Sequence, residues 1–226
     1  YGDHRALNSF PTRRSSDLEL SWRHMGRVID FSLPGMFIQD GVRGRHPVLS
    51  ITGGACALEC DHCRGRLLGR MIPVKSPDAL VERCRSLAAG GIRGVLISGG
   101  CDAEGRLPWG RFMGAIRADK AETDLFVSVH SGLVDDRDAQ GLKQAGVDQA
   151  LIDVVGCDET LRTVFHLPFG VARIEAALAA LARVGLAVVP HIVCGIHYGE
   201  MRGEKAAVEV ISRFPVHQVV IVSLMP

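Results

Sequence analysis

The sequence predicts a parallel α/β fold whose strands form part of a barrel, and two observations support this class. From Val48 onward, short runs rich in valine, isoleucine and leucine alternate with longer amphipathic segments, as expected for buried parallel strands joined by helices. Glycine separates a helical segment from the next apolar run around Gly91, Gly146 and Gly185, where a left-handed residue ends a helix. Six strands in one continuous alternation favour a partial (β/α)6 TIM-like barrel. A doubly wound open sheet is the alternative, because strand order cannot be deduced from sequence.

The expected strands follow one another at regular intervals. They span residues 48–53, 94–98, 125–130, 149–155, 186–196 and 218–224. The clearest helix is expected over residues 171–184, where Ile174, Leu178 and Leu181 form one apolar stripe. The sequence ends directly after the sixth expected strand, and a full eight-stranded barrel typically takes about 250 residues. A core that is incomplete at its C-terminus is therefore expected.

Three segments are expected along the chain. Residues 1–18 show no hydrophobic periodicity, and part of them resembles a peptide translated from a sequencing adapter. They are expected to be a non-native or disordered leader. Residues 19–47 are expected to lead into the fold, and residues 48–226 to form its core.

Composition excludes several classes of partner. The net charge is +1 and no tract of lysine or arginine occurs, which argues against a nucleic-acid surface. No apolar run approaches the roughly 18 residues that a membrane span needs. Seven cysteines without a secretory signal fit a reducing compartment better than a disulfide framework. A cytoplasmic protein is expected.

Three cysteines stand within eight residues, at Cys56, Cys60 and Cys63, and no matching pair follows later in the chain. A structural zinc site takes four ligands, usually as two pairs far apart in sequence. Three clustered thiolates suit an iron–sulfur cluster that leaves one iron open to a ligand. A zinc site completed by a distant histidine or cysteine is the alternative.

The spacing C-x3-C-x2-C in a loop after the first expected strand resembles the signature of the radical S-adenosylmethionine (radical SAM) enzymes. The resemblance implies that Cys56, Cys60 and Cys63 hold a [4Fe–4S] cluster whose fourth iron is chelated by S-adenosylmethionine. It also implies reductive cleavage of that cofactor to a 5′-deoxyadenosyl radical, which abstracts hydrogen from a substrate. His62 stands where the family usually has an aromatic residue near the adenine.

Two glycine-containing segments match the family in part. Ser98, Gly99, Gly100 and Cys101 follow the second expected strand and resemble the family's GGE element, which contacts the methionyl amino group. Cysteine replaces the glutamate, so the resemblance carries the backbone role and not the side-chain role. Gly195 and Ile196 close the fifth expected strand. They resemble a segment with which members of the family pack against adenine. A tight strand-to-helix turn is the equal alternative.

Polar residues also stand near the ends of other expected strands. Asp153 lies late in the fourth, and an ionised carboxylate in a buried strand is costly unless it is paired. If Asp153 points into the barrel, it serves the cofactor ribose, the substrate or a neighbouring cation. His130 and Ser131 follow the third strand and His191 lies within the fifth. A structural role is favoured for each histidine.

The remaining cysteines have two interpretations. Cys101, Cys157 and Cys194 lie at or just beyond strand ends, and ligation of an auxiliary iron–sulfur cluster by these three thiols is one interpretation. Buried structural cysteines are the favoured interpretation. Cys84, in a helical stretch over residues 78–88, is expected to serve packing alone.

Further stretches, at residues 50–53, 64–68 and 153–160, resemble the biotin-synthase-related group that includes a component of the two-protein lipoyl synthase. That resemblance implies sulfur insertion into a small-molecule or protein-bound acyl substrate, a reductant such as ferredoxin or flavodoxin, and a possible partner radical SAM subunit. A radical SAM mutase or maturase without sulfur insertion is one alternative. A non-catalytic barrel that binds zinc or an iron–sulfur cluster is the other.

Overall fold

The computed structural model describes residues 11–28, 30, 31, 33, 35, 38–216 and 218–223. The chain divides into two units, Tyr1–Ser32 and Leu33–Pro226, and each is described by itself.

The first unit contains one helix, α1, over Pro11–Met25. It crosses the boundary at residue 18 that the sequence predicts between a leader and a lead-in segment. Leucine, arginine and glutamate have high intrinsic helix propensity, so this helix forms although the sequence shows no apolar stripe. The part of the predicted leader before residue 11 lies outside the described residues.

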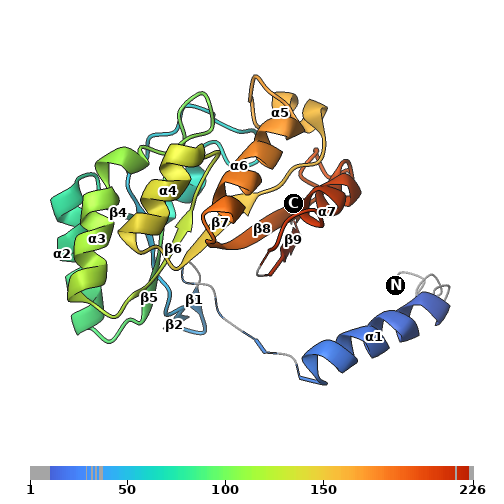
Figure 1. Cartoon of the computed structure of the whole chain (residues 1–226), viewed down its shortest axis with the longest axis horizontal. Helices are drawn as coiled ribbons and strands as arrows, with labels where there is room; N and C mark the ends of the chain where they lie inside the picture. Colours follow the sequence, from blue (N-terminus) through green and yellow to red (C-terminus); the bar gives the residue numbers. More distant parts are fainter. Residues whose placement is uncertain are drawn as a thin grey trace. The chain divides into compact units, whose positions relative to one another are not determined.

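One open sheet of seven parallel strands forms the second unit, in the order β4-β3-β5-β6-β7-β8-β9 (Figure 1). Apart from β4, the order in space follows the order along the chain. A doubly wound sheet reverses direction at its centre, so that alternative is excluded and the partial barrel is confirmed. The strands are β3 (Val48–Ser50), β4 (Ile72–Pro73), β5 (Gly94–Ser98), β6 (Phe126–His130), β7 (Gln149–Asp153), β8 (Ala187–Cys194) and β9 (Val220–Ser223).

Six of these strands lie within the ranges expected from the sequence, which extend up to three residues further at an end, and β4 is an addition. It pairs with β3 through Leu49↔Ile72 and Ser50↔Pro73. Two residues that end in proline give no strand signal in a sequence, which explains why six strands were expected instead of seven. A hairpin of two short strands, β1 (Ile38–Gln39) and β2 (Val42–Arg43), precedes the sheet. Residue 224, the last of the sixth expected strand, lies outside the described residues.

Helices connect the strands and cover one face of the sheet. Neighbouring helices α2, α3, α4 and α6 pack against one another in chain order (Figure 1). The expected glycine junctions are confirmed, because Gly91, Gly146 and Gly185 all have positive φ. The helices are α2 (Pro77–Ala89), α3 (Met113–Glu122), α4 (Asp136–Ala145), α5 (Asp158–Thr163), α6 (Val171–Arg183) and α7 (Glu204–Ile211), with 3-10 turns η2 (Arg66–Arg70) and η3 (Trp109–Arg111). In the described part of the chain, no helix combines the length and apolar character that crossing a membrane requires.

Side chains of each strand alternate between the helix-covered face and the opposite face. In β7, Ala150 and Ile152 are fully buried, whereas Gln149, Leu151 and Asp153 are partly accessible. The parallel register carries this alternation to the neighbouring strands. The face away from the helices, which we call the inner face, therefore bears the partly accessible polar side chains.

Candidate functional site

The three clustered cysteines lie in a loop that leaves the end of β3. The chain turns at once after this strand, where the hydroxyl of Ser50 donates to the carbonyl of Gly53 at 2.7 Å. Within the loop, Cys63 N–H and Arg64 N–H both donate to the carbonyl of Cys60, at 3.0 and 2.8 Å. Cys60 is buried, and Cys56 and Cys63 are half-buried. The backbone thus turns back between Cys60 and Cys63. We call residues 55–66 the cysteine loop.

Electrostatics around the cysteine loop favour one thiolate. The hydrogen bond from Cys60 and then the neighbouring His62 lower the pKa of Cys63 to about 4. The same hydrogen bond, together with burial, raises the pKa of Cys60 above its usual range. Cys63 is thus a thiolate at neutral pH, the form in which cysteine binds a metal.

The Gly99-Gly100 turn after β5 packs directly against the cysteine loop. Gly100 N–H donates to Thr52 Oγ1 at 2.7 Å, and Ala57 N–H donates to the carbonyl of Cys101 at 2.7 Å. A Cβ at residue 100 would lie 2.1 Å from the carbonyl oxygen of Ala55, so glycine is required here. The two segments that the sequence predicts as cofactor-binding are in contact.

A hollow of about 690 Å³ opens beside this contact. It is bordered by both segments and by the chain after β5, with Thr52, Gly54, Ala55, Cys56, Ala57, Glu59, Gly100, Cys101, Asp102, Arg106, Leu107 and Pro108 as its lining. Burial raises the pKa of Cys101 to about 12, and the negative charges of Cys56 and Asp102 act in the same direction. Cys101 is thus a neutral thiol at the edge of the hollow, where the family's GGE element has a glutamate.

A clasp from the chain after α5 holds the cysteine loop in place. Asp61 N–H donates to the carbonyl of Val164 at 2.9 Å, and Cys60 Sγ lies 3.6 Å from the carbonyl oxygen of Phe165. His166 Nδ1 donates to the carbonyl of Leu58 at 2.8 Å. We call residues 164–166 the clasp.

Asp61 is the side chain that joins the cysteine loop to the clasp and to the turn after β8. Tyr198 donates its hydroxyl to Asp61 Oδ2 at 2.7 Å, and His166 Nε2 lies 3.3 Å from Asp61 Oδ1. These partners, with the Tyr198 hydrogen bond first, hold the pKa of Asp61 below its usual value. His166 and Tyr198 both have positive φ, a costly conformation for residues with a side chain. The fold therefore accepts strain where it fixes this loop.

His62, predicted to lie near a cofactor, packs on the clasp. Its ring centroid is 5.0 Å from that of Phe165, at an interplanar angle of 51°. Its neighbour Cys63 takes part of its low pKa from His62. The ring is thus held beside the sulfur atoms from the side of α5.

The turn after β8 is shaped by a carboxylate that the sequence analysis does not single out. Gly195 has a φ of 75°, and its N–H donates to Glu204 Oε1 at 2.9 Å. Ile196 is buried, and Tyr198 of the same turn reaches Asp61. The predicted Gly195–Ile196 segment thus lies at the same end of the sheet as the cysteine loop and is linked to it through one side chain.

Three polar residues that the sequence places on separate strands come together on the inner face. Donor atoms of His130, Asp153 and His191 lie within 4.8 Å of one another. His130 Nε2 is 3.6 Å from Asp153 Oδ1, and the two imidazole centroids are 5.9 Å apart. Ser131 is different, because its buried hydroxyl donates to the backbone carbonyls of Gly132 and Leu151.

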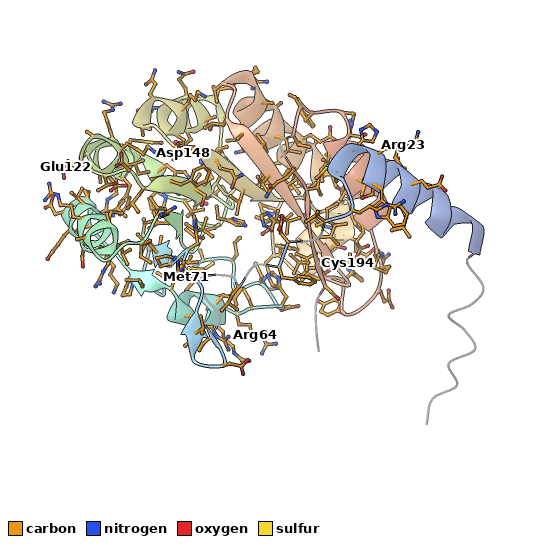
Figure 2. All side chains as sticks on the ribbon, turned by 90° about the horizontal axis from the view of Figure 1, so that it is seen from below. Arg23, Arg64, Met71, Glu122, Asp148 and Cys194 are labelled. Atoms are coloured by element: carbon orange, nitrogen blue, oxygen red, sulfur yellow. The ribbon has the colours of Figure 1, made fainter. Side chains whose placement is uncertain are left out.

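The other cysteines do not assemble into a second ligand set in the described part of the chain. Cys101 lies by the hollow, whereas Cys157 begins α5 beside Thr160 and Arg202, whose hydrogen bonds and charge overcome burial and lower its pKa. Cys194, labelled in Figure 2, ends β8, and among described residues no three cysteines bring their sulfur atoms within 4.8 Å of one another. Cys84 is fully buried in α2, and its thiol also interacts with the Asp119 carboxyl.

Sequence analysis misses the residues that support the site: Thr52, Asp61, Phe165, His166, Tyr198 and Glu204. Their roles depend on contacts across 9 to 137 residues of chain, and nothing in local periodicity announces such contacts. The one available signal is Asp61, a carboxylate placed between two of the clustered cysteines.

Comparison with known proteins agrees with this geometry. The family model of the radical SAM superfamily matches residues 50–207, which is more than half of the chain. No curated protein matches the sequence. Among solved structures, methylornithine synthase is similar with a TM-score of 0.64 and 15% identity, over 98% of this chain and 63% of that one.

Two further structures share the fold. HydG, a maturase of the [FeFe]-hydrogenase, has a TM-score of 0.57 and 14% identity, over 81% of this chain and 44% of that one. SuiB of Streptococcus suis has a TM-score of 0.60 and 12% identity, over 100% of this chain and 47% of that one. The chain therefore spans less than two thirds of the length of each, and identities this low support the fold alone.

Proposed function

The chain belongs to the radical SAM superfamily, and from this premise we propose that it forms the core of an enzyme that cleaves S-adenosylmethionine reductively. A [4Fe–4S] cluster and S-adenosylmethionine are the cofactors of this family. When bound, the cluster supplies the electron for a cleavage that yields a 5′-deoxyadenosyl radical, which takes a hydrogen atom from the substrate. The observation that carries the proposal is the packing of the cysteine loop against the Gly99-Gly100 turn at the end of β5.

The donor set fits the cluster better than it fits a single zinc ion. Sulfur ligands of one tetrahedral zinc would lie about 3.8 Å apart, given a Zn–S bond near 2.3 Å. Among described residues, the group whose donor atoms come within 4.8 Å of one another is the histidine–aspartate group of the inner face, and the three cysteines are not such a group. Three thiols without a fourth suit a cluster that leaves one iron open to a ligand.

The chain's own residues would then divide the work. Cys56, Cys60 and Cys63 would hold the cluster. The clasp keeps the cysteine loop in place through its contacts with Leu58, Cys60 and Asp61. Backbone groups of the half-buried Gly99 would bind the methionyl end of the cofactor, while Gly100 lets the turn pack closely on the cysteine loop. Ser98 is buried at the end of β5 and supports that turn. His62, Gly195 and Ile196 would border the adenosine.

Substitution of one cysteine tests the proposal. The chain and its Cys60→Ala variant are reconstituted anaerobically with iron and sulfide, and both are assayed for iron, labile sulfide, zinc and formation of 5′-deoxyadenosine under a strong reductant. Cys84→Ala is the matched control, because Cys84 is also buried but lies in α2. We expect four iron and four sulfide per chain in the parent and in Cys84→Ala, and loss of both cluster and cleavage in Cys60→Ala. Zinc without labile sulfide, or cleavage unaffected by Cys60→Ala, would support the non-catalytic barrel instead.

Sulfur insertion into a small-molecule or protein-bound acyl group is the narrower proposal. It rests on the resemblance to biotin-synthase-related proteins and requires a sulfur donor in addition to the first cluster. Reconstituted parent chain with iron and sulfide above four per chain, lost on substitution of Cys101, would favour it. A content of four would favour the mutase or maturase alternative. In either case the proposed electron donor is a ferredoxin or flavodoxin.

A further inference from the structure

His130, Asp153 and His191 come from three adjacent strands and project from the same face. Asp153 of β7 is paired in register with His191 of β8. His130 of β6 is paired with Leu151, which lies two residues before Asp153 and therefore shares its face. His130 and Asp153 are the last residues of β6 and β7, where parallel barrels place functional groups, and His191 lies within β8, opposite Asp153. The juxtaposition is thus fixed by the sheet itself, the most rigid part of the fold.

The donor atoms are close enough to share one ion. One donor atom from each residue lies within 4.8 Å of the other two, and His130 Nε2 is already 3.6 Å from Asp153 Oδ1. Ligands held about 2.0–2.1 Å from one ion in tetrahedral geometry lie about 3.3 Å apart. The side chains therefore have to close by at most about 1.5 Å, which side-chain rotation on a fixed backbone can supply.

The side chains of this group are partly accessible to solvent. The side chains of His130 and Asp153 are 28% and 41% exposed. All three residues are half-buried, so an ion can reach their donor atoms from the inner face.

One histidine is also oriented as a ligand. His191 Nδ1 lies 3.2 Å from the carbonyl of Val189, so Nδ1 carries the proton and Nε2 has a free lone pair. A ligating histidine commonly donates its second ring nitrogen to a backbone carbonyl in this way.

We propose that His130, Asp153 and His191 bind one divalent transition-metal ion on the inner face of the sheet. Two imidazoles and one carboxylate are a ligand set for Zn²⁺, Fe²⁺ or Co²⁺. Three protein ligands leave at least one coordination position open, and that position faces the barrel mouth, not the helices. A substrate carboxylate or hydroxyl is the class of ligand that the ion would take there. The proposal goes beyond the radical chemistry and does not depend on it.

Cobalt(II) is a suitable probe because its visible absorption reports the number and type of ligands. The measurement uses the full chain with Cys56, Cys60 and Cys63 replaced by alanine. This variant lacks the cluster ligands, so radical chemistry is absent. Under anaerobic conditions we expect one Co²⁺ per chain, measured by absorption and by calorimetry. Asp153→Asn and His191→Gln keep the size of each side chain, and each is expected to weaken binding by at least about tenfold.

His46→Gln is the matched control. His46 is also half-buried, and its Nε2 lies 3.0 Å from the Ser128 hydroxyl on the same face, but it does not belong to the group. This variant is expected to bind Co²⁺ like its parent, and far-UV circular dichroism establishes that every variant is folded. No bound Co²⁺, equal binding by Asp153→Asn and its parent, or an absorption band of a sulfur–cobalt bond would overturn the proposal. Each of these results leaves the proposed cluster chemistry unaffected, because the cluster ligands are absent.

Discussion

Replacing Gly100 with alanine tests how closely the turn after β5 packs on the cysteine loop. A Cβ at residue 100 would lie 2.1 Å from the carbonyl oxygen of Ala55 and 2.5 Å from Cβ of Cys56. Such contacts essentially never fall below 3.0 Å, so the turn and the loop have to separate by about 0.9 Å. The opposing atoms belong to the backbone or lie next to it, so no side-chain rotation relieves the contact.

We expect the Gly100→Ala chain to fold with an unfolding free energy about 1–3 kcal/mol lower than that of its parent, the usual cost of overpacking. A displacement near 1 Å at a reacting centre typically slows a reaction about 100-fold. The assays are urea unfolding, iron and labile sulfide per chain after anaerobic reconstitution, and the rate of 5′-deoxyadenosine formation. Cleavage is expected to fall further than iron content.

Gly54→Ala is the control in the same region. A Cβ at residue 54 meets nothing within 4 Å, and the residue does not have positive φ, so this variant should behave like its parent. A Gly100→Ala chain with the parent's iron content and cleavage rate would refute the packing argument. Equal losses in both variants would also refute it, because they would indicate a loop that is sensitive to any added methyl group.

Three further substitutions test the supporting structure. Asp61→Asn removes the carboxylate that Tyr198 and His166 address, and we expect cluster affinity to fall about tenfold, as for other groups that orient metal ligands. Trp109→Phe removes the indole hydrogen bond to the carbonyl of Ser131, at 2.8 Å in a fully buried site, and should lower the unfolding free energy by about 2 kcal/mol. Asp119→Asn should raise it by about 1 kcal/mol at pH 7, because Asp119 Oδ2 is buried without a hydrogen-bond partner among described residues.

The control for Asp61→Asn is Tyr198→Phe, which keeps the carboxylate and should show a smaller loss of cluster; an equal or larger loss would contradict a central role of Asp61. For Asp119, burial raises the pKa in the folded state above the unfolded value near 3.9. The free energy of unfolding therefore falls as pH rises from the unfolded-state pKa of Asp119 to its higher folded-state pKa. It stays reduced above the folded-state pKa. The gain from Asp119→Asn should shrink as pH falls toward 4, and a gain independent of pH would contradict the ionisation argument.

The fold class was predictable because its signals are local. Each buried parallel strand is a short apolar run, and Gly91, Gly146 and Gly185 mark helix ends through the one conformation that glycine adopts easily. β4 was not predictable, because its two residues carry no such pattern and its pairing with β3 is set by the rest of the sheet. The helix α1 was missed for the opposite reason, since it depends on intrinsic propensity and not on an apolar stripe.

The site was predictable only where its residues are adjacent in sequence. The cysteine spacing and the glycine pair can be recognised in the sequence. Their contact follows from the parallel pairing of β3 with β5, the strands that they follow. The assembly of His130, Asp153 and His191 requires the strand order and the register, neither of which a single sequence provides. Each histidine alone was better explained as a structural residue, and only their convergence on Asp153 changes that interpretation.

The clasp also sets an order of events while the protein is being made. Its contacts with the cysteine loop span 105 residues from Cys60 to Phe165 and 108 from Leu58 to His166, and Tyr198 follows Asp61 by 137 residues. At about 5–20 residues per second, synthesis reaches Tyr198 roughly 7–27 s after Asp61. The clasp is made before Tyr198, so the nascent loop first lacks both partners and then lacks Tyr198 alone. Iron and sulfide delivered to the finished fold meet a preorganised loop, whereas the same ions delivered early meet a flexible peptide with three reactive thiols.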